Sequence, residues 1–153
     1  MLRLAIALIV VAAGAAIVQF AASSAPPVSS SADCTGTPLY ELSAAQLDQH
    51  LRSLASAEPD PAVRLCRLAE QNRRQPYQAN ALGEGPYDAA DPRPLYALRY
   101  GDTASFVEQL LAMSVTSDFE SFFLVLQRLR YRDGQVSTAT RNHNLLADGP
   151  GNN

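Results

Sequence analysis

The sequence is poor in the side chains that form most metal and redox sites. It contains no tryptophan, two cysteines and two histidines among 153 residues. His50 and His143 stand far apart, and neither belongs to a group with metal-ligand spacing, so no metal site is indicated. The glycines of "LGEGP" precede no predicted helix, which argues against a phosphate-binding loop. We therefore expect neither a metal nor a cofactor.

Charge is scarce as well. Asp, Glu, Lys and Arg make up 18% of the residues, against about 25% in an ordinary globular chain. The formal net charge is −3 at pH 7. A protein without an excess of basic side chains has no field that holds nucleic acid by its phosphates. We therefore expect no nucleic-acid partner. The length of the chain is sufficient for one small domain.

The one long hydrophobic run lies at the N-terminus. Arg3 is followed by an apolar run from Leu4 to Val18 and then by small residues near Pro26. This order is typical of a secretory signal. Residues 4–20 also approach the length that spans a bilayer, so a membrane anchor is the alternative. We predict that residues 1–25 are a signal peptide or an N-terminal membrane anchor. The protein is then exported, to the periplasm or another part of the cell envelope.

A Ser/Pro-rich segment follows, and we predict a linker over residues 26–38. It contains Cys34, which together with Cys66 is a disulfide candidate in an oxidising compartment. Closing a loop of about 30 residues would stabilise the fold by about 3–4 kcal/mol. Lipid modification of Cys34 is the alternative, although no aliphatic side chain stands three residues before it.

Helix signals dominate the rest of the chain. Apolar residues recur at helical spacing within residues 42–57, 58–74, 102–114 and 117–131, and each segment opens with a capping residue. Ser43 with Gln46, and Ser117 with Glu120, have the spacing of capping boxes. Between the second and third segments, residues 75–99 are rich in proline and glycine. A loop of that length in a small domain is usually functional.

The pattern changes after Tyr131. An Asp-Gly turn precedes a short extended stretch, and residues 141–148 could form a further strand. We therefore predict an α+β fold that is mostly helical, with about four helices followed by one or two short strands. The predicted domain covers residues 39–148, and residues 149–153 form a loose tail.

Three blocks of sequence together resemble a known family. They are "PYQANALGEGP" (76–86), "GDTASFVEQLLA" (101–112) and "RLRYRDGQVSTATRNHNLLAD" (128–148). They resemble the N-acetylmuramoyl-L-alanine amidase-like cysteine hydrolases, relatives of the papain-like cell-wall peptidases. In that family the middle block reads Asp-Cys-Thr-Thr-Phe-Val-Glu, and its cysteine is the nucleophile. Members continue well beyond the Asn-His pair of the last block, so the resemblance, which covers about residues 41–148, implies a shortened domain.

The resemblance places Thr103 where the family has its nucleophilic cysteine. His143 matches the catalytic histidine and Asp148 the acid that follows it, while Gly149 replaces a tryptophan. A thiol at a helix N-terminus is favoured as a thiolate by the positive end of the helix dipole. That dipole contributes only about 1 kcal/mol and does not ionise a threonine hydroxyl. Threonine nucleophiles usually act beside their own N-terminal amine, which Thr103 lacks. A capping role for Thr103 is the simpler interpretation.

Three functions are compatible with these residues. The first is a catalytically silent relative that binds peptidoglycan peptides (muropeptides) or an envelope partner. Its candidate binding residues are Tyr77, Asn80, Asp102 and Asn142. The second is an active amidase or peptidase that uses Thr103 or Ser105 with His143 and Asp148. The third is a membrane-tethered helical scaffold without a ligand. In each case the unpaired edge of the predicted C-terminal strand could pair with a second copy of the chain.

Overall fold

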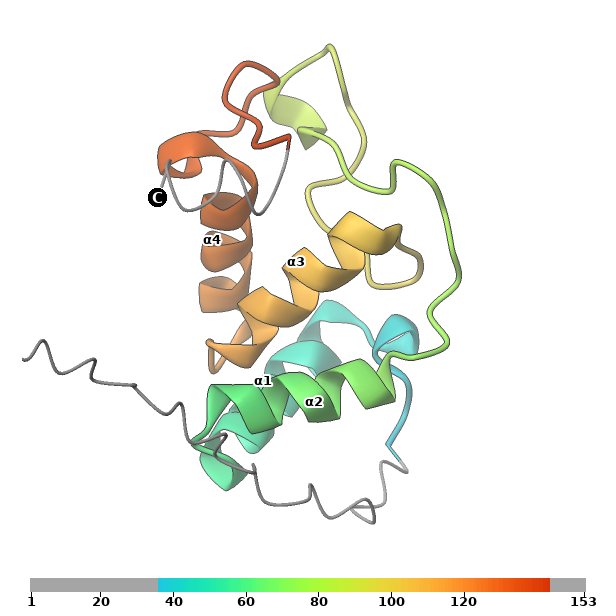
Figure 1. The fold of residues 1–153 in the computed structure, drawn as a ribbon, viewed down its shortest axis with the longest axis vertical. Coiled ribbons are helices and arrows are strands. Elements are labelled where there is room, and N and C mark those ends of the chain that lie inside the picture. Colours follow the sequence, from blue (N-terminus) through green and yellow to red (C-terminus); the bar gives the residue numbers. More distant parts are fainter. Residues whose placement is uncertain (1–35, 144–153) are drawn as a thin grey trace, which may run out of the picture. The chain divides into compact units, whose positions relative to one another are not determined.

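The computed structural model describes residues 36–143. The predicted leader, Cys34, Asp148 and the predicted tail lie outside the described residues. All four expected helices are present, and α1 (Ala44–Ala57) and α2 (Pro61–Gln71) lie beside each other (Figure 1). A 3₁₀ helix, Leu39–Glu41, precedes them and buries Leu39. No helix among the described residues is both long enough and apolar enough to cross a membrane.

Local hydrogen bonds explain where the first two helices begin. The Ser43 hydroxyl accepts a hydrogen bond from the Gln46 amide at 3.3 Å, and the Gln46 side chain accepts one from the Ser43 amide at 2.9 Å. This is the predicted capping box. The Asp60 carboxylate accepts from the Ala62 amide at 2.8 Å, and Pro61 occupies the first helical position, where its missing N–H costs nothing.

The other two helices are α3 (Thr103–Ser114) and α4 (Phe119–Arg130). Asp102 caps α3 in a capping box with Ser105. The predicted box of Ser117 with Glu120 is wrong. Asp118 caps α4 instead, because its carboxylate is the group that reaches the Ser121 amide, at 2.8 Å.

The helices pack around one main hydrophobic core. α3 contacts both α2 and α4, and α4 also contacts α1. Side chains from all four helices meet there, so the helical faces predicted from apolar spacing are buried. The core includes Leu47, Leu51, Leu68, Leu110, Met113, Phe122 and Leu126. Tyr96, from the loop, packs edge-on against Phe119 with ring centroids 5.3 Å apart.

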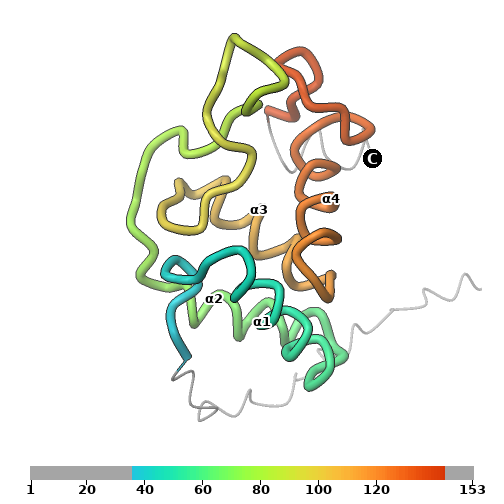
Figure 2. The backbone as a smooth tube through the Cα atoms, turned by 180° about the vertical axis from the view of Figure 1, so that it is seen from behind, coloured from blue at the N-terminus to red at the C-terminus, as the bar shows by residue number. Residues whose placement is uncertain are grey.

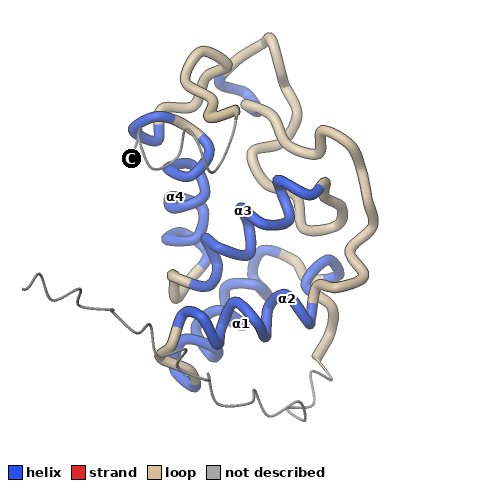
Figure 3. The backbone as a smooth tube through the Cα atoms, viewed as in Figure 1, coloured by secondary structure: helices blue, strands red, loops and turns tan. Residues whose placement is uncertain are grey.

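The predicted strands are wrong for the described residues, which contain no strand (Figure 3). The Asp-Gly turn is a 3₁₀ helix, Arg132–Gly134, and only one antiparallel bridge follows, between Tyr131 and Arg141. Asp133 and Gly134 both have positive φ, 54° and 69°. The backbone then bonds within short turns instead of along a ladder, because the Gln135 amide donates to the Arg132 carbonyl at 3.1 Å and the Thr140 amide donates to the Ser137 carbonyl at 3.2 Å. The described residues therefore offer no strand edge for the self-association we expected.

The chain between α2 and α3 is a long irregular loop that runs beside α3 and reaches the segment after α4 (Figure 2). Its end returns to the N-terminus of α3 through a parallel bridge between Tyr77 and Gly101. A Cβ atom at Gly101 would stand 2.8 Å from the Gln75 side-chain oxygen and 3.1 Å from the Ser105 hydroxyl. Glycine is therefore required for the close approach that places the loop against the start of α3.

Candidate functional site

A pocket of about 250 Å³ opens where the long loop, the first turns of α3 and the segment after α4 meet. Four of the residues predicted from sequence line it: Asn80, Asp102, Asn142 and His143. It is also lined by Ser105 and Glu108 of α3. A larger pocket of about 310 Å³ lies against α1 around His50, but no residue of the three motif blocks lines it. We therefore place the candidate site at the first pocket.

Asp102 lines the pocket and also forms hydrogen bonds to both the long loop and the first turn of α3. One carboxylate oxygen accepts from the Ser105 amide at 2.8 Å and the other from the Ala81 amide at 3.2 Å. Burial acts to raise the pKa of Asp102, but these backbone hydrogen bonds outweigh it and leave the pKa lowered. The carboxylate is thus held ionised as a cap that joins the loop to α3.

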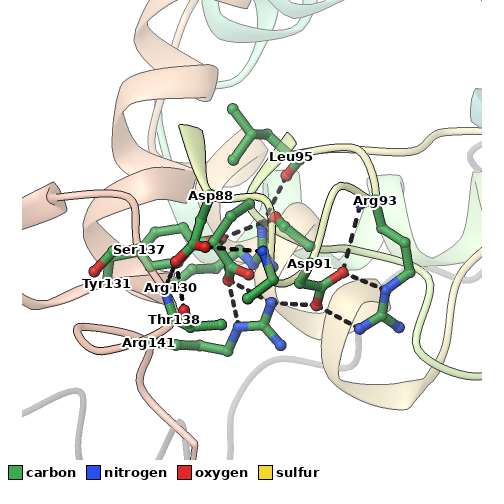
Figure 4. A network of polar contacts seen from close by, with 12 residues as sticks. Asp88, Asp91, Arg93, Leu95, Arg130, Tyr131, Ser137, Thr138 and Arg141 are labelled. Atoms are coloured by element: carbon green, nitrogen blue, oxygen red, sulfur yellow. Dashed lines mark hydrogen bonds and ion pairs between the residues drawn. The ribbon is translucent and has the colours of Figure 1, made fainter. Parts of the chain in front are cut away.

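Arginine side chains form the other wall of the pocket: Arg93, Arg130 and Arg141. Arg141 Nε donates to Glu84 at 2.6 Å, and Arg141 Nη2 donates to Asp91 at 2.6 Å (Figure 4). Asp91 is also bound by Arg93, whose Nε donates to it at 2.6 Å. Hydrogen bonds from Arg93, and then from Arg141, hold the pKa of Asp91 well below its ordinary value. This network fastens the C-terminal segment onto the loop.

The network continues into the interior through Glu84 and Tyr131. Glu84 is completely buried, and the Tyr131 hydroxyl donates to the Gly83 carbonyl at 2.9 Å and approaches a Glu84 oxygen at 3.2 Å. Burial raises the pKa of Tyr131 to about 12.

A second set of hydrogen bonds joins the long loop to the segment after α4. The Asp88 carboxylate accepts from the Thr138 amide at 3.0 Å and also binds the Thr138 hydroxyl. The Thr138 hydroxyl and amide lower the pKa of Asp88 to about 2.

Glu108 and Arg130 face each other across the floor of the pocket. Arg130 Nε stands 3.6 Å from a Glu108 oxygen, and the two side chains are 6% and 12% exposed. Burial raises the pKa of Glu108, and the attraction of Arg130 offsets this only in part. The protonated form of Glu108 is therefore more favoured than that of an exposed glutamate.

Comparison with known proteins agrees with the motif blocks. The model of a family described as AmiA-like, N-acetylmuramoyl-L-alanine amidase-like, matches residues 67–148. The chain belongs to this amidase-like family. No curated protein matches the sequence. A crystal structure of a Legionella pneumophila protein from the family DUF1460 is similar, with 27% identity and a TM-score of 0.59. The similarity covers 71% of this chain but only 37% of that protein.

Within this amidase-like domain, the predicted nucleophile position, Thr103, stands between two residues that line the pocket, Asp102 and Ala104. Thr103 is exposed at the first position of α3 and is not among the residues that line the pocket with His143. Ser105, the other hydroxyl considered, is 3% exposed. Its hydroxyl accepts from the Asp102 amide at 2.8 Å and donates to the Asp102 carbonyl at 3.1 Å. The Ser105 hydroxyl is therefore engaged as the second half of the helix cap.

Asn142 and Tyr77, the other two predicted binding residues, differ in their positions. The Asn142 side chain donates to the Leu129 carbonyl at 3.1 Å, so it anchors the C-terminal segment as well as lining the pocket. Tyr77 is 75% exposed and does not line the pocket.

The arginines and Glu108 were missed from the sequence. Glu108 and Arg130 lie inside the family-like blocks, which was the available signal, but each looked like an ordinary charged residue of an amphipathic helix.

Proposed function

We propose that this amidase-like protein is exported to the cell envelope and binds the peptide part of peptidoglycan without hydrolysing it. One observation carries the proposal: the pocket retains His143, Asn80 and Asp102, while the hydroxyl at the nucleophile position is exposed outside its lining. Acyl transfer requires a nucleophile within hydrogen-bond reach of its base. The Thr103 hydroxyl lacks the acidity of a thiol, whereas the polar walls suit a bound peptide.

Binding is tested by sedimentation with purified sacculi. Ala104 is exposed at the second position of α3 and lines the pocket, so Ala104→Phe narrows the pocket without removing a buried contact. Ala45 is exposed at the second position of α1, and Ala45→Phe is the matched control. We expect the wild type and the control to sediment with sacculi and the Ala104→Phe variant to bind at least tenfold more weakly. Equal sedimentation of all three proteins would overturn binding at this pocket.

The same protein preparations test whether the wild-type protein lacks hydrolytic activity. Muropeptides incubated with the wild-type protein should remain intact by chromatography and mass spectrometry. Release of the peptide from the sugar by the wild type, abolished in His143→Ala, would show that the protein is an active amidase.

Export is tested separately by the mass of the protein recovered from the envelope of an expressing bacterium. Cleavage near residues 22–26 is expected from the small residues there. Recovery of the intact chain from the cytoplasm would contradict export.

A further inference from the structure

The floor of the pocket contains a buried ion pair, Glu108 with Arg130, whose two side chains are not hydrogen-bonded to each other. Arg130 Nε and the Glu108 oxygen are 3.6 Å apart, longer than a hydrogen bond between these atoms. No hydrogen bond reaches the Glu108 carboxylate from the part of the chain that the structure describes. Arg130 Nη1 donates to the carbonyls of Leu95 at 2.9 Å and Gly83 at 3.3 Å. Within residues 36–143 the other N–H groups of Arg130 have no hydrogen-bond acceptor.

Such a pair is costly unless something completes it. Charged side chains that are this buried are normally hydrogen-bonded as well as paired. Here a guanidinium has donors to spare and a carboxyl has free acceptors, and both line the same pocket. A ligand group that accepts from Arg130 and donates to Glu108 would satisfy both side chains simultaneously.

The surrounding charges select among ligand groups. Arg93 and Arg141 are neutralised by Asp91 and Glu84. A free carboxylate would therefore find one available guanidinium, with Glu108 beside it and Asp102 on the same wall. A free ammonium could donate to Glu108, but it has no acceptor for the spare N–H groups of Arg130. An amide carries no net charge, and it presents an oxygen to accept from Arg130 and an N–H to donate to Glu108.

We propose that Glu108 and Arg130 form an amide-recognition site that selects a carboxamide over a carboxylate in the bound peptide. This inference rests on the proposed function and specifies the chemical class of the ligand. Glu108 is a binding residue in this arrangement, and no bond is made or broken.

Two ligands with one skeleton test the selection, because they differ only at the α-carboxyl of the last residue. N-acetylmuramoyl-L-alanyl-D-isoglutamine has a carboxamide there, and N-acetylmuramoyl-L-alanyl-D-glutamate has a carboxylate. Calorimetry at pH 7 on the full chain should give at least tenfold tighter binding of the carboxamide. Glu108→Gln keeps the shape and an acceptor oxygen but removes the negative charge. We expect it to strengthen carboxylate binding at least fivefold and to change carboxamide binding less than threefold.

Glu120→Gln, an exposed carboxyl on α4, is the matched control and should preserve the tenfold preference. Far-UV circular dichroism identifies any variant that fails to fold. Binding of both ligands with equal affinity, or an unchanged preference in Glu108→Gln, overturns amide recognition and leaves the proposed function standing. If neither ligand binds while the protein still sediments with sacculi, amide recognition is also overturned. Failure of sacculi to bind as well would refute the proposed function too.

Discussion

Replacing Arg141 by alanine tests whether the charged network holds the C-terminal segment in place. Arg141 binds Glu84 and Asp91, both in the middle of the long loop, through donors 2.6 Å from their oxygens. Glu84 is 0% exposed, and one of its oxygens already has no partner among the described residues. Without Arg141, the Tyr131 hydroxyl at 3.2 Å is the hydrogen-bond donor left to Glu84 in residues 36–143. The substitution therefore leaves a buried carboxylate without its counter-charge.

The structure sets the size of the effect. Removing one partner of a fully buried ion pair costs about 3–5 kcal/mol. The Arg141 side chain is 23% exposed, so water screens part of this interaction. We expect a loss of about 2–4 kcal/mol in the free energy of unfolding. For a domain of this size, that corresponds to a fall in Tm of about 10–25 °C.

Urea denaturation followed by far-UV circular dichroism measures the loss in four proteins: wild type, Arg141→Ala, Glu84→Gln and the double variant. The double variant should be less destabilised than the sum of the single variants by about 1–3 kcal/mol, because the glutamine needs no counter-charge. Arg132→Ala removes an exposed arginine from the neighbouring turn and should change the stability by less than about 0.5 kcal/mol.

Two results would refute this reasoning. The first is a loss below about 1 kcal/mol in Arg141→Ala. The second is strict additivity in the double variant, since the two side chains would then not be coupled.

Three further predictions follow from other contacts. Asp102→Ala removes the cap of α3 together with the hydrogen bond from the Ala81 amide of the loop. It should lower the free energy of unfolding, measured by urea denaturation, by about 1–2 kcal/mol. An unchanged stability would show that the cap is not needed. The lowered pKa of Asp91 means that its contribution to stability is present above the ordinary carboxyl pKa and is lost as the pH falls through its folded value. The wild type should therefore lose stability between about pH 5 and pH 2 more steeply than Asp91→Asn does, and parallel pH profiles would contradict this. In a background with Cys34→Ser and Cys66→Ser, the thiol introduced by Thr103→Cys should titrate near pH 8 in alkylation-rate measurements, because the helix dipole alone lowers its pKa by less than one unit. Titration below pH 6 would reveal an imidazole partner and an intact catalytic pair.

Much of the helical structure is predictable from sequence because its causes are local. Ser43 with Gln46 and Asp60 with Pro61 predict two helix starts that the structure confirms. The start of α4 is off by one residue, since Ser117 and Asp118 are both good caps and only the backbone geometry chooses between them. The strands fail because a ladder needs two segments to run side by side. After Tyr131 the amides of Gln135 and Thr140 bond to carbonyls three residues before them, within short turns, instead of to a neighbouring strand.

The sequence by itself determined the family, through three blocks of residues, and it determined the helices, through caps and apolar spacing within a few residues of each other. It also predicts that Thr103 stands where the family has its nucleophilic cysteine. Only the tertiary structure decided that Glu108 meets Arg130 and that Arg141 holds Glu84. Those partners are 22 and 57 positions apart in the sequence, and charged side chains carry no local signal of which distant charge they will meet. Burial then gives such pairs their strength, and burial is a property of the folded chain alone.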